Sequence, residues 1–491
     1  MPNRPWLWIF LILLFHAVTL VIIVLLFYAE EDWRGAHLLT KTKAAWQARG
    51  ESFDPGHFLT AAVPDGLNLA AAPLFKMQYE PKEDSWAPRA LDEAFDPLRH
   101  GGPLPRTDEA DFPVATARLY AAAFPKATPP AGALAQLEAL YPVLRQLRAE
   151  AALRPEFQLD SLDHGRAWNR PLGLLTGQIK VVRLLSLHAR LALREHRPDV
   201  ALDDVRLILR LSRGTGRDPS LVGGLVAIAT GVFARIAIND GVEHHTWADA
   251  QLAALPLELE RLDYLAQYQF SLRAELVTVT LPLFAMVKAQ RGSLAHDVRA
   301  VNRDSPPRET ALALFRDSWP EGWWDLNAAQ VIGFVLREVH TVDPGAHRVF
   351  PDVAKRLADE EDDEWSGPVG FLPWNYLSTI AAAPFTTMAR NTARMQTSID
   401  QARIACALER CRLAQGKYPA TLDALAPAFI DAVPRDIING EPYRYRLNAD
   451  DTFLLYSVGW NQTDDGGKEV DEPGRQHRDD TQGDWVWPMA R

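Results

Sequence analysis

The stretch "IKVVRLLSLHARLALREHRPDVALDDVRLILRLSR", residues 179 to 213, decides the fold class of this chain. Its first half places Val182, Leu185 and Ala189 at spacings of three and four, which gives a helix one apolar stripe. The break "HRPD" follows, and Pro198 suits the first turn of the next helix. Two helices joined by so short a break predict an antiparallel helical hairpin.

The same alternation of apolar stripes, charged faces and short polar breaks continues from Ala133 to about Gln290. No repeat of about 34 residues recurs in register, so an array of identical helical repeats is not predicted. We therefore expect a mainly α fold with an irregular multi-helix domain at residues 132–395. Residues 31–131, with Pro-rich breaks at 96–113 and 124–132, are expected to be an irregular segment of helices and loops.

The composition limits the class of protein. The chain has 491 residues and a net charge of −11, so it lacks the basic surplus that neutralises phosphates, and no nucleic-acid partner is expected. Its two cysteines, Cys406 and Cys411, lie five residues apart in a predicted helix, too far apart for a disulfide. We expect both to be small buried apolar residues.

The N-terminal segment "WLWIFLILLFHAVTLVIIVLLFY", residues 6–28, carries no charge. As a helix it is roughly 34 Å long, enough to cross a hydrocarbon core of about 30 Å. It is longer than the apolar region of an ordinary signal peptide, and no small-x-small cleavage site follows in "FYAEEDW". We expect an uncleaved anchor, with residues 1–30 forming a cytoplasmic tip and a transmembrane helix.

The charges around this span indicate its orientation. Arg4 precedes it, and Glu30, Glu31 and Asp32 follow it, which favours an N-terminus inside the cytoplasm. The remaining chain is then extracytoplasmic, in a bacterial inner membrane protein. Two later apolar stretches, 221–238 and 276–287, are expected to be buried helices, which makes the protein single-pass.

Sequence motifs for catalysis are missing. There is no G-x-S-x-G, H-E-x-x-H, phosphate-binding G-x-x-x-x-G-K or C-x-x-C. The nearest approach to a catalytic group is His164, which stands close in sequence to Asp160 and Asp163 and resembles a base with its orienting acid. His244 and His245 are adjacent and point apart in a helix, so they do not suit one metal.

The C-terminal part, residues 396–491, has a different pattern. "SIDQARIACALERCRLAQG" predicts a helix with Ser398 as its N-cap and Gly416 just after its end. In "PYRYRL" apolar and basic residues alternate, and "NADD" separates this segment from the apolar run "TFLLYSVG". Helix, strand, turn and returning strand predict a small α+β module with an antiparallel sheet.

This order resembles the C-terminal part of the major pseudopilin of type II secretion systems. The resemblance covers residues 398–487, under a fifth of the chain, and combines "G-x-Y-P", "P-x-D", "G-x-P-Y-x-Y" and "Y-S-x-G" motifs before an acidic Gly-rich loop. The residues that carry it are Gly416, Tyr418, Pro419, Leu422, Leu425, Pro434, Asp436, Gly440, Pro442, Tyr443, Tyr445, Tyr456, Ser457 and Gly459.

The resemblance implies a calcium site in the acidic loop, because calcium takes oxygen ligands and the family binds it there. By position the ligands would be Asn461, Asp464, Asp465 and either Asp471 or Asp484. Asn461 stands where the family has an acid, and the loop is longer, so a plain solvated loop is the alternative. The apolar span also lacks the Gly at which the family's leader is cut and the Glu near the start of its helix, and nearly 370 residues separate the span from the module, so assembly into a pilus is not expected.

The sequence thus predicts a non-enzymatic, membrane-anchored interaction protein of the bacterial envelope, with protein partners there and a type II secretion-like end. The alternative is an envelope enzyme with its site around His164. A third reading is that the C-terminal module only caps the helical domain.

Overall fold

The computed structural model describes residues 5–75, 78–80, 85–87, 112–159, 172–289, 318–365, 374, 385–471 and 478–488. They form a mainly helical protein with small antiparallel sheets. The chain divides into two compact units, each built from three separate stretches. Unit 1 contains residues 1–57, 275–338 and 355–385, and unit 2 contains residues 58–274, 339–354 and 386–491.

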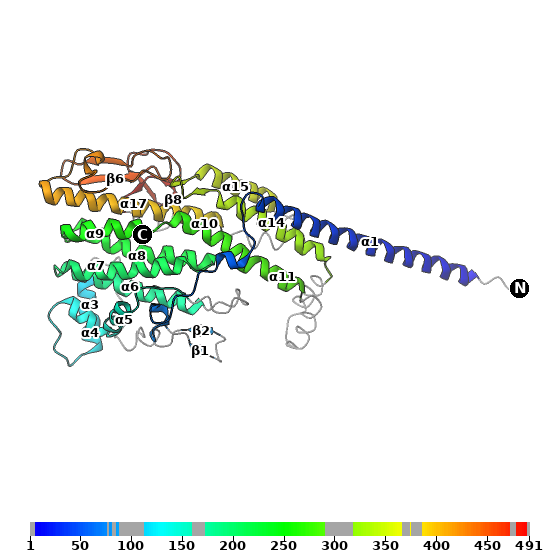
Figure 1. Ribbon diagram of the computed structural model, residues 1–491, viewed down its shortest axis with the longest axis horizontal. Helices are drawn as coiled ribbons and strands as arrows, with labels where there is room; N and C mark the ends of the chain where they lie inside the picture. Colours follow the sequence, from blue (N-terminus) through cyan, green and yellow to red (C-terminus); the bar gives the residue numbers. More distant parts are fainter. Residues whose placement is uncertain are drawn as a thin grey trace. The chain divides into compact units, whose positions relative to one another are not determined.

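Unit 1 is organised around one long helix. Helix α1 runs without a break from Pro5 to Gln47, so the predicted membrane span continues directly into a further helical segment. Helices α11 (Leu281–Ala289) and α14 (Glu321–Val339) belong to the same unit up to residue 338. Figure 1 shows the N-terminal half of α1 extending beyond the ends of α11 and α14.

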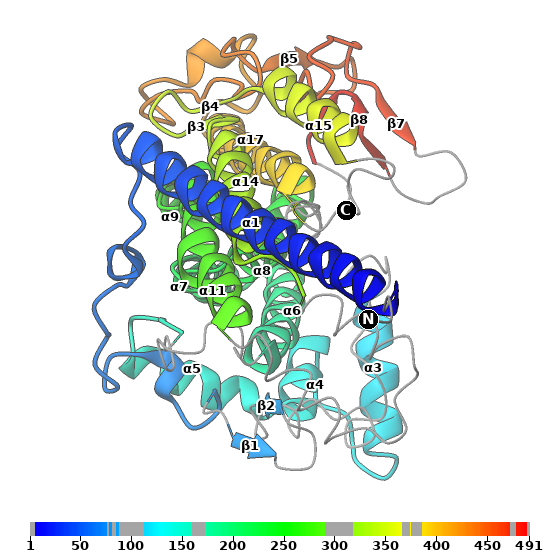
Figure 2. The same cartoon turned by 90° about the vertical axis from the view of Figure 1, so that its right-hand side faces the viewer.

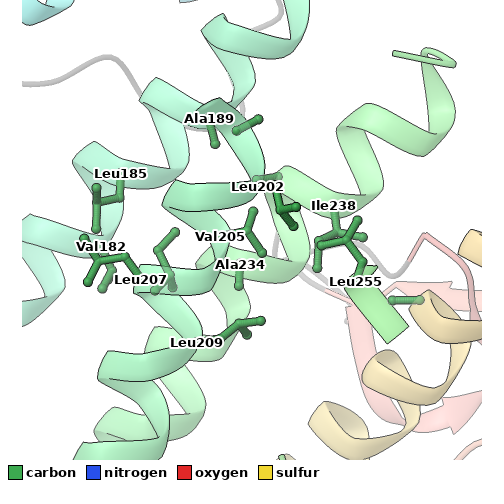
Figure 3. Close-up of a cluster of buried hydrophobic side chains, with 14 of the residues drawn as sticks. Val182, Leu185, Ala189, Leu202, Val205, Leu207, Leu209, Ala234, Ile238 and Leu255 are labelled. Carbon is green, nitrogen blue, oxygen red and sulfur yellow. The ribbon is translucent and has the colours of Figure 1, made fainter. Parts of the chain in front are cut away.

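Three helices form the centre of unit 2, and Figure 3 shows part of their shared core. They are α6 (Leu172–Arg194), α7 (Pro198–Gly216) and α8 (Leu221–Glu243), and each packs against the other two. Val182, Leu185 and Ala189 are fully buried, as their spacing predicts. Pro198 is the first residue of α7, so the predicted helical hairpin is confirmed.

Shorter elements surround this centre. The helical body of unit 2 is α6, α7 and α8 together with the helices around them. Those helices include α3 (Phe112–Ala123), α4 (Ala133–Leu140), α5 (Val143–Leu153), α9 (Asp249–Glu260) and α10 (Tyr264–Ala274). Short turns of helix lie at Pro55–Phe58 and Leu69–Ala71. A π-helical turn, Glu275–Thr280, joins α10 to α11. Two small hairpins pair β1 (Gln78–Glu80) with β2 (Ser85–Ala87), and β3 (Val342–Asp343) with β4 (Arg348–Val349).

The C-terminal module begins with a longer helix than predicted. Helix α17 runs from Phe385 to Gln415, so the interpretation of Ser398 as an N-cap is wrong. Ser398 lies inside the helix, where its hydroxyl donates to the Met395 carbonyl oxygen at 2.7 Å. Gly416 follows the helix with φ of +75°, a conformation that glycine adopts without strain, as predicted.

The strands of the module form two sheets. Strand β6 (Phe453–Ser457) lies between β5 (Arg444–Leu447) and β9 (Trp485–Val486), antiparallel to both, which confirms the predicted hairpin. Strands β7 (Glu469–Asp471) and β8 (Arg478–Gly483) form a second antiparallel pair. A turn of 3-10 helix, Leu422–Leu425, precedes them. Leu447 is 40% exposed, so the expected apolar face does not stay buried to the end of β5.

The acidic run 359–364 falls in helix α15 (Pro351–Trp365). Its acidic residues predict a solvated surface segment. Asp359 and Glu360 are exposed, as this predicts, and Glu360 pairs with Arg337 at 3.1 Å. The helix is amphipathic at its start and acidic at its end.

Within unit 2 the module and the helical body share one hydrophobic core. That core contains residues of α6 to α9 together with Ile399, Leu408 and Leu455. Figure 1 and Figure 2 both show α17 between the small sheets and α8. The side-chain oxygen of Gln396 also accepts the Tyr264 backbone N–H at 3.0 Å, which ties α17 to the start of α10.

Among the residues that the structure describes, three helical stretches are long and apolar enough to cross a membrane. In the first, Trp8–Gln47, none of the most apolar window is buried in the protein. In the other two, Leu221–Glu243 and Asp249–Ala289, 67% and 44% of the window are buried. Burial within the protein therefore separates α1 from the two later stretches.

Candidate functional site

The acidic loop after β6 holds Asp464 through several donors. Its carboxylate accepts hydrogen bonds from the Tyr456 hydroxyl at 2.9 Å, the Arg444 guanidinium at 3.0 Å and the Gly466 backbone N–H at 3.1 Å. The Tyr456 hydrogen bond, with help from the Gly466 N–H and Arg444, lowers the pKa of Asp464 below its usual value. Asp464 is therefore a charged group already engaged by β5 and β6.

Asp484 closes the same loop from its other end. It is buried, with 2% of its surface exposed, and accepts the backbone N–H groups of Gly467 at 2.7 Å and of Asp465 and Lys468 at 3.3 Å. Burial raises the pKa of this carboxyl, while the three N–H groups act against that rise. One side chain thus holds the backbone N–H groups of three loop residues, Asp465, Gly467 and Lys468.

The structure brings four of the five candidate calcium ligands into this loop. The Asn461 amide donates to the Asp465 carboxylate at 3.0 Å. Asp471 instead lies exposed on β7, opposite Arg478 of β8. Within the part of the chain that the structure describes, no group of three or more His, Cys, Asp or Glu side chains is arranged to hold a metal ion. Calcium would have to compete with Arg444 for Asp464.

A small pocket lies beside the loop, at the second hairpin. Arg394 of α17 lines it and pairs with Asp480 at 3.1 Å. Its other lining residues are Glu469, Val470, Asp479, Gln482, Asp484 and Trp485. The pocket is polar and predominantly acidic, and its one basic side chain is already paired.

A second cluster, which the sequence did not indicate, joins the β3–β4 hairpin to α17. Asp400 is fully buried, and one of its carboxylate oxygens lies 2.9 Å from His347 Nε2 and accepts the Tyr443 hydroxyl at 3.4 Å. Gln396 donates to the other oxygen at 3.4 Å. The hydrogen bond to Asp400 raises the pKa of His347, which favours its charged form. The arrangement is a charge-assisted contact between a half-exposed histidine and a buried acid.

A third cluster, also missed, is buried among the helices. His188 is completely buried and lies 2.6 Å from Asp204 and 3.1 Å from Glu138. Arg148 adds a 2.6 Å ion pair to Asp204. Since these four residues come from α4, α5, α6 and α7, the cluster fixes how the helices pack. Its signal in the sequence was weak, because a single His on an apolar stripe looks like a core residue.

The remaining predicted candidates are His164 with its neighbouring acids, the adjacent histidines and the two cysteines. Asp160, Asp163 and His164 lie outside the described residues. His244 bonds to the Asp240 carbonyl oxygen at 2.8 Å, and His245 to the Glu409 carboxylate at 2.9 Å, so the two histidines serve different partners. Cys406 and Cys411 are buried free thiols, as expected, and burial raises the pKa of Cys406 to about 12.

A junction between α1 and α14 lies just past the apolar run of α1. The Tyr28 hydroxyl donates to the Ser318 carbonyl oxygen, and Asp32 accepts the Gly322 backbone N–H at 2.8 Å. Glu31 is buried and accepts the Trp323 indole N–H at 2.8 Å. A Cβ atom added at Gly35 would overlap the Gly322 carbonyl oxygen, so the two helices cross at a glycine pair.

Comparisons with known proteins add no assignment. No family model matches the chain, and no curated protein and no solved structure matches it either.

Proposed function

We propose that this chain is a non-enzymatic, single-pass protein of the bacterial inner membrane, with its bulk outside the cytoplasm and with protein partners in the envelope. The observation that carries the proposal is α1. Its apolar window is entirely unburied, while the helix continues into a packed junction with α14. An apolar surface of that length is stable only inside a hydrocarbon layer or a partner.

Two observations support a single span. Most of the apolar window of α8 is buried, and its residues belong to the core of unit 2. Arg235, Asn239 and Asp240 lie on the same helix and are buried, and Asp240 pairs with Arg190 at 3.1 Å. A helix that buries charged and polar side chains against its protein neighbours is typical of a protein core and not of a lipid-facing span.

The interaction role rests on the C-terminal module, for which we propose a pseudopilin-like character. A long helix, a short apolar turn, an antiparallel hairpin and an acidic loop occur in the order that the resemblance implies. Exposed apolar residues on this module, Leu447 and Val470, offer contact sites for another protein. We propose that its partner belongs to a secretion or envelope-assembly system.

The orientation is tested by protease treatment of cells that make the protein with a C-terminal tag. In spheroplasts, external protease should remove the tag and digest the bulk of the chain. In inverted membrane vesicles the same protease should leave the bulk intact. Protection in spheroplasts together with digestion in inverted vesicles would overturn the proposed location.

Calcium binding in the acidic loop stays a prediction of the resemblance. The loop offers carboxylate and amide oxygens, the ligand atoms that calcium prefers. In this structure the Asp464 carboxylate accepts a hydrogen bond from Arg444, which calcium would have to displace. If calcium binds, it should raise the melting temperature of the full chain relative to chelator, and Arg444→Gln should enlarge the difference. Asp464→Ala with Asp465→Ala should abolish it. Identical melting of the unaltered chain in calcium and in chelator would leave a solvated loop.

A further inference from the structure

We propose that the N-terminal end of α14, with the partly exposed Trp323, sits in the headgroup region of the membrane, so that unit 1 rests on the lipid surface. This inference rests on the proposed function, in which residues 6–28 span the bilayer. It adds a second contact with the membrane, made by a part of the chain about 290 residues away from the span, as the Tyr28–Ser318 contact shows.

The depth of this contact follows from its partners on α1. The rings of Trp323 and Phe27 meet edge to face, with centroids 6.3 Å apart. Phe27 and Tyr28 are the last two residues of the apolar run. Because a helix rises about 1.5 Å per residue, a side chain on Phe27 lies within a few ångströms of the end of the span. Trp323 is therefore placed at the border between hydrocarbon and headgroups.

The chemistry of the cluster suits that border. Trp319 contacts Trp324 and Trp323 at ring distances of 5.6 and 6.1 Å, and Trp323 contacts Trp374 at 5.2 Å. The Trp323 indole N–H donates to Glu31, which follows the apolar run of α1. The Trp323 ring lies against Phe27, which belongs to that run. Trp319 and Trp324 are buried, with 5% and 2% of their surface exposed, so the contact with lipid is assigned to Trp323, which is partly exposed. An indole ring with one apolar and one hydrogen-bonded edge is typical of membrane interfaces.

Basic side chains lie beside the same end of α14. Lys288, at the end of α11, pairs with Asp325 at 2.9 Å, which brings α11 to the first turns of α14. Arg34, half-exposed, lies on α1 next to the junction and pairs with Glu31 at 2.7 Å. Both basic groups are paired with acids, so the argument for lipid rests on the position of Trp323 at the end of the span and not on a basic surface. Because the span holds the start of α14 at the edge of the bilayer, we propose lipid as the partner of this surface.

The experiment places nitroxide labels on the full chain in nanodiscs of phosphatidylethanolamine and phosphatidylglycerol. Three single substitutions are compared: Val18→Cys in the span, Glu321→Cys at the first turn of α14, and Gln47→Cys at the far end of α1. All three positions are exposed. Gln47 is the matched control, because it lies on the same helix, roughly 28 Å beyond Tyr28. The native Cys406 and Cys411 are buried and should stay unlabelled.

Depth is read from collisions with oxygen, which concentrates in lipid, and with a nickel chelate, which stays in water. The Val18 label should collide mainly with oxygen and the Gln47 label mainly with nickel. The Glu321 label should fall between them, with at least a threefold lower nickel-to-oxygen ratio than Gln47. Equal ratios at Glu321 and Gln47, with Val18 in lipid, would overturn the lipid contact and leave the anchor standing. A water-exposed Val18 would overturn the proposed span and this inference together.

Discussion

At the scale of single residues, Asp484 is the buried carboxylate that holds the backbone of the acidic loop, through three N–H groups. Replacing it with Asn leaves one oxygen where two accepted three backbone N–H groups, so buried donors lose their partners. We expect Asp484→Asn to lower the free energy of unfolding by about 1–3 kcal/mol, measured by urea denaturation. Asp431→Asn, at an exposed position of the same module, is the control and should change little. Equal stability of the two variants would mean that the loop does not depend on Asp484.

His347 should make stability depend on pH. The pKa of this histidine is raised, chiefly by its hydrogen bond to Asp400, and Asp263 adds to the rise while Arg403 opposes it. A raised pKa stabilises the folded state fully below the unfolded value, about 6.5, and the contribution is lost as pH rises through the folded pKa. His347→Asn should therefore cost more stability at pH 5.5 than at pH 9, measured by urea denaturation.

The control for that experiment is His196→Asn. His196 and His347 share a left-handed backbone, with φ of 55° and 51°, which Asn tolerates, and His196 is exposed. His196→Asn thus provides the reference, and the difference between the two variants at each pH measures the contact with Asp400. A pH-independent loss for His347→Asn would show that its contact with Asp400 is not charged.

Residue patterns predicted the apolar positions better than the polar ones. The burial of Val182 and Cys406 was predicted because both residues fall on an apolar stripe with helical spacing. The pairing of His347 with Asp400 depends on residues 53 positions apart in the chain, and no local pattern encodes such a distance. Ser398 was misread as an N-cap because a serine just before an apolar stripe looks the same in the sequence whether the helix starts there or earlier.

At the scale of elements, the crossing of α1 and α14 depends on two glycines. A methyl group at Gly322 would overlap the backbone of Glu31 and Asp32, so Gly322→Ala must push the helices apart. We expect a loss of about 1–3 kcal/mol in unfolding free energy, measured in detergent by thermal or chemical unfolding. The variant should also weaken the Trp323 contact with Glu31.

Gly333 provides the matched control on the same helix. Among the described residues, a Cβ at Gly333 meets nothing within 4 Å. Gly333→Ala should be neutral or stabilise the helix by about 0.5–1 kcal/mol, because alanine loses less backbone entropy than glycine. If both substitutions had the same effect, close packing at Gly322 would not be what holds α14 to α1.

Helices and strands were predicted correctly where the apolar pattern extended over many residues. The α6–α7 hairpin and the β5–β6 hairpin had clear apolar periods and turn residues, and both are confirmed. The start of α17 was misplaced by 13 residues, because "FTTMARNTARMQT" has few large apolar residues. Its small residues are buried against neighbours, such as Ala389 and Ala393, which periodicity alone could not reveal.

At the scale of the whole molecule, the chain forms two units whose stretches alternate along the sequence. Composition shifts suggested the C-terminal module as a separate part. Its β5–β6 hairpin was predicted, whereas α17 starts earlier than predicted and β7, β8 and β9 were not predicted. The core that it shares with α6 to α9 follows from contacts between distant segments, which the sequence does not display.

The central claim is that α1 alone holds the protein in the membrane. It is tested most directly by deleting residues 2–26, which removes the span but keeps Phe27 and Tyr28, and by washing membranes with alkaline carbonate. The account predicts that the intact chain stays in the membrane pellet. The shortened chain should appear in the supernatant with its helical circular dichroism retained. A shortened chain that remains in the washed membranes would contradict the account, because α8 or the α9–α11 stretch would then have to span the bilayer.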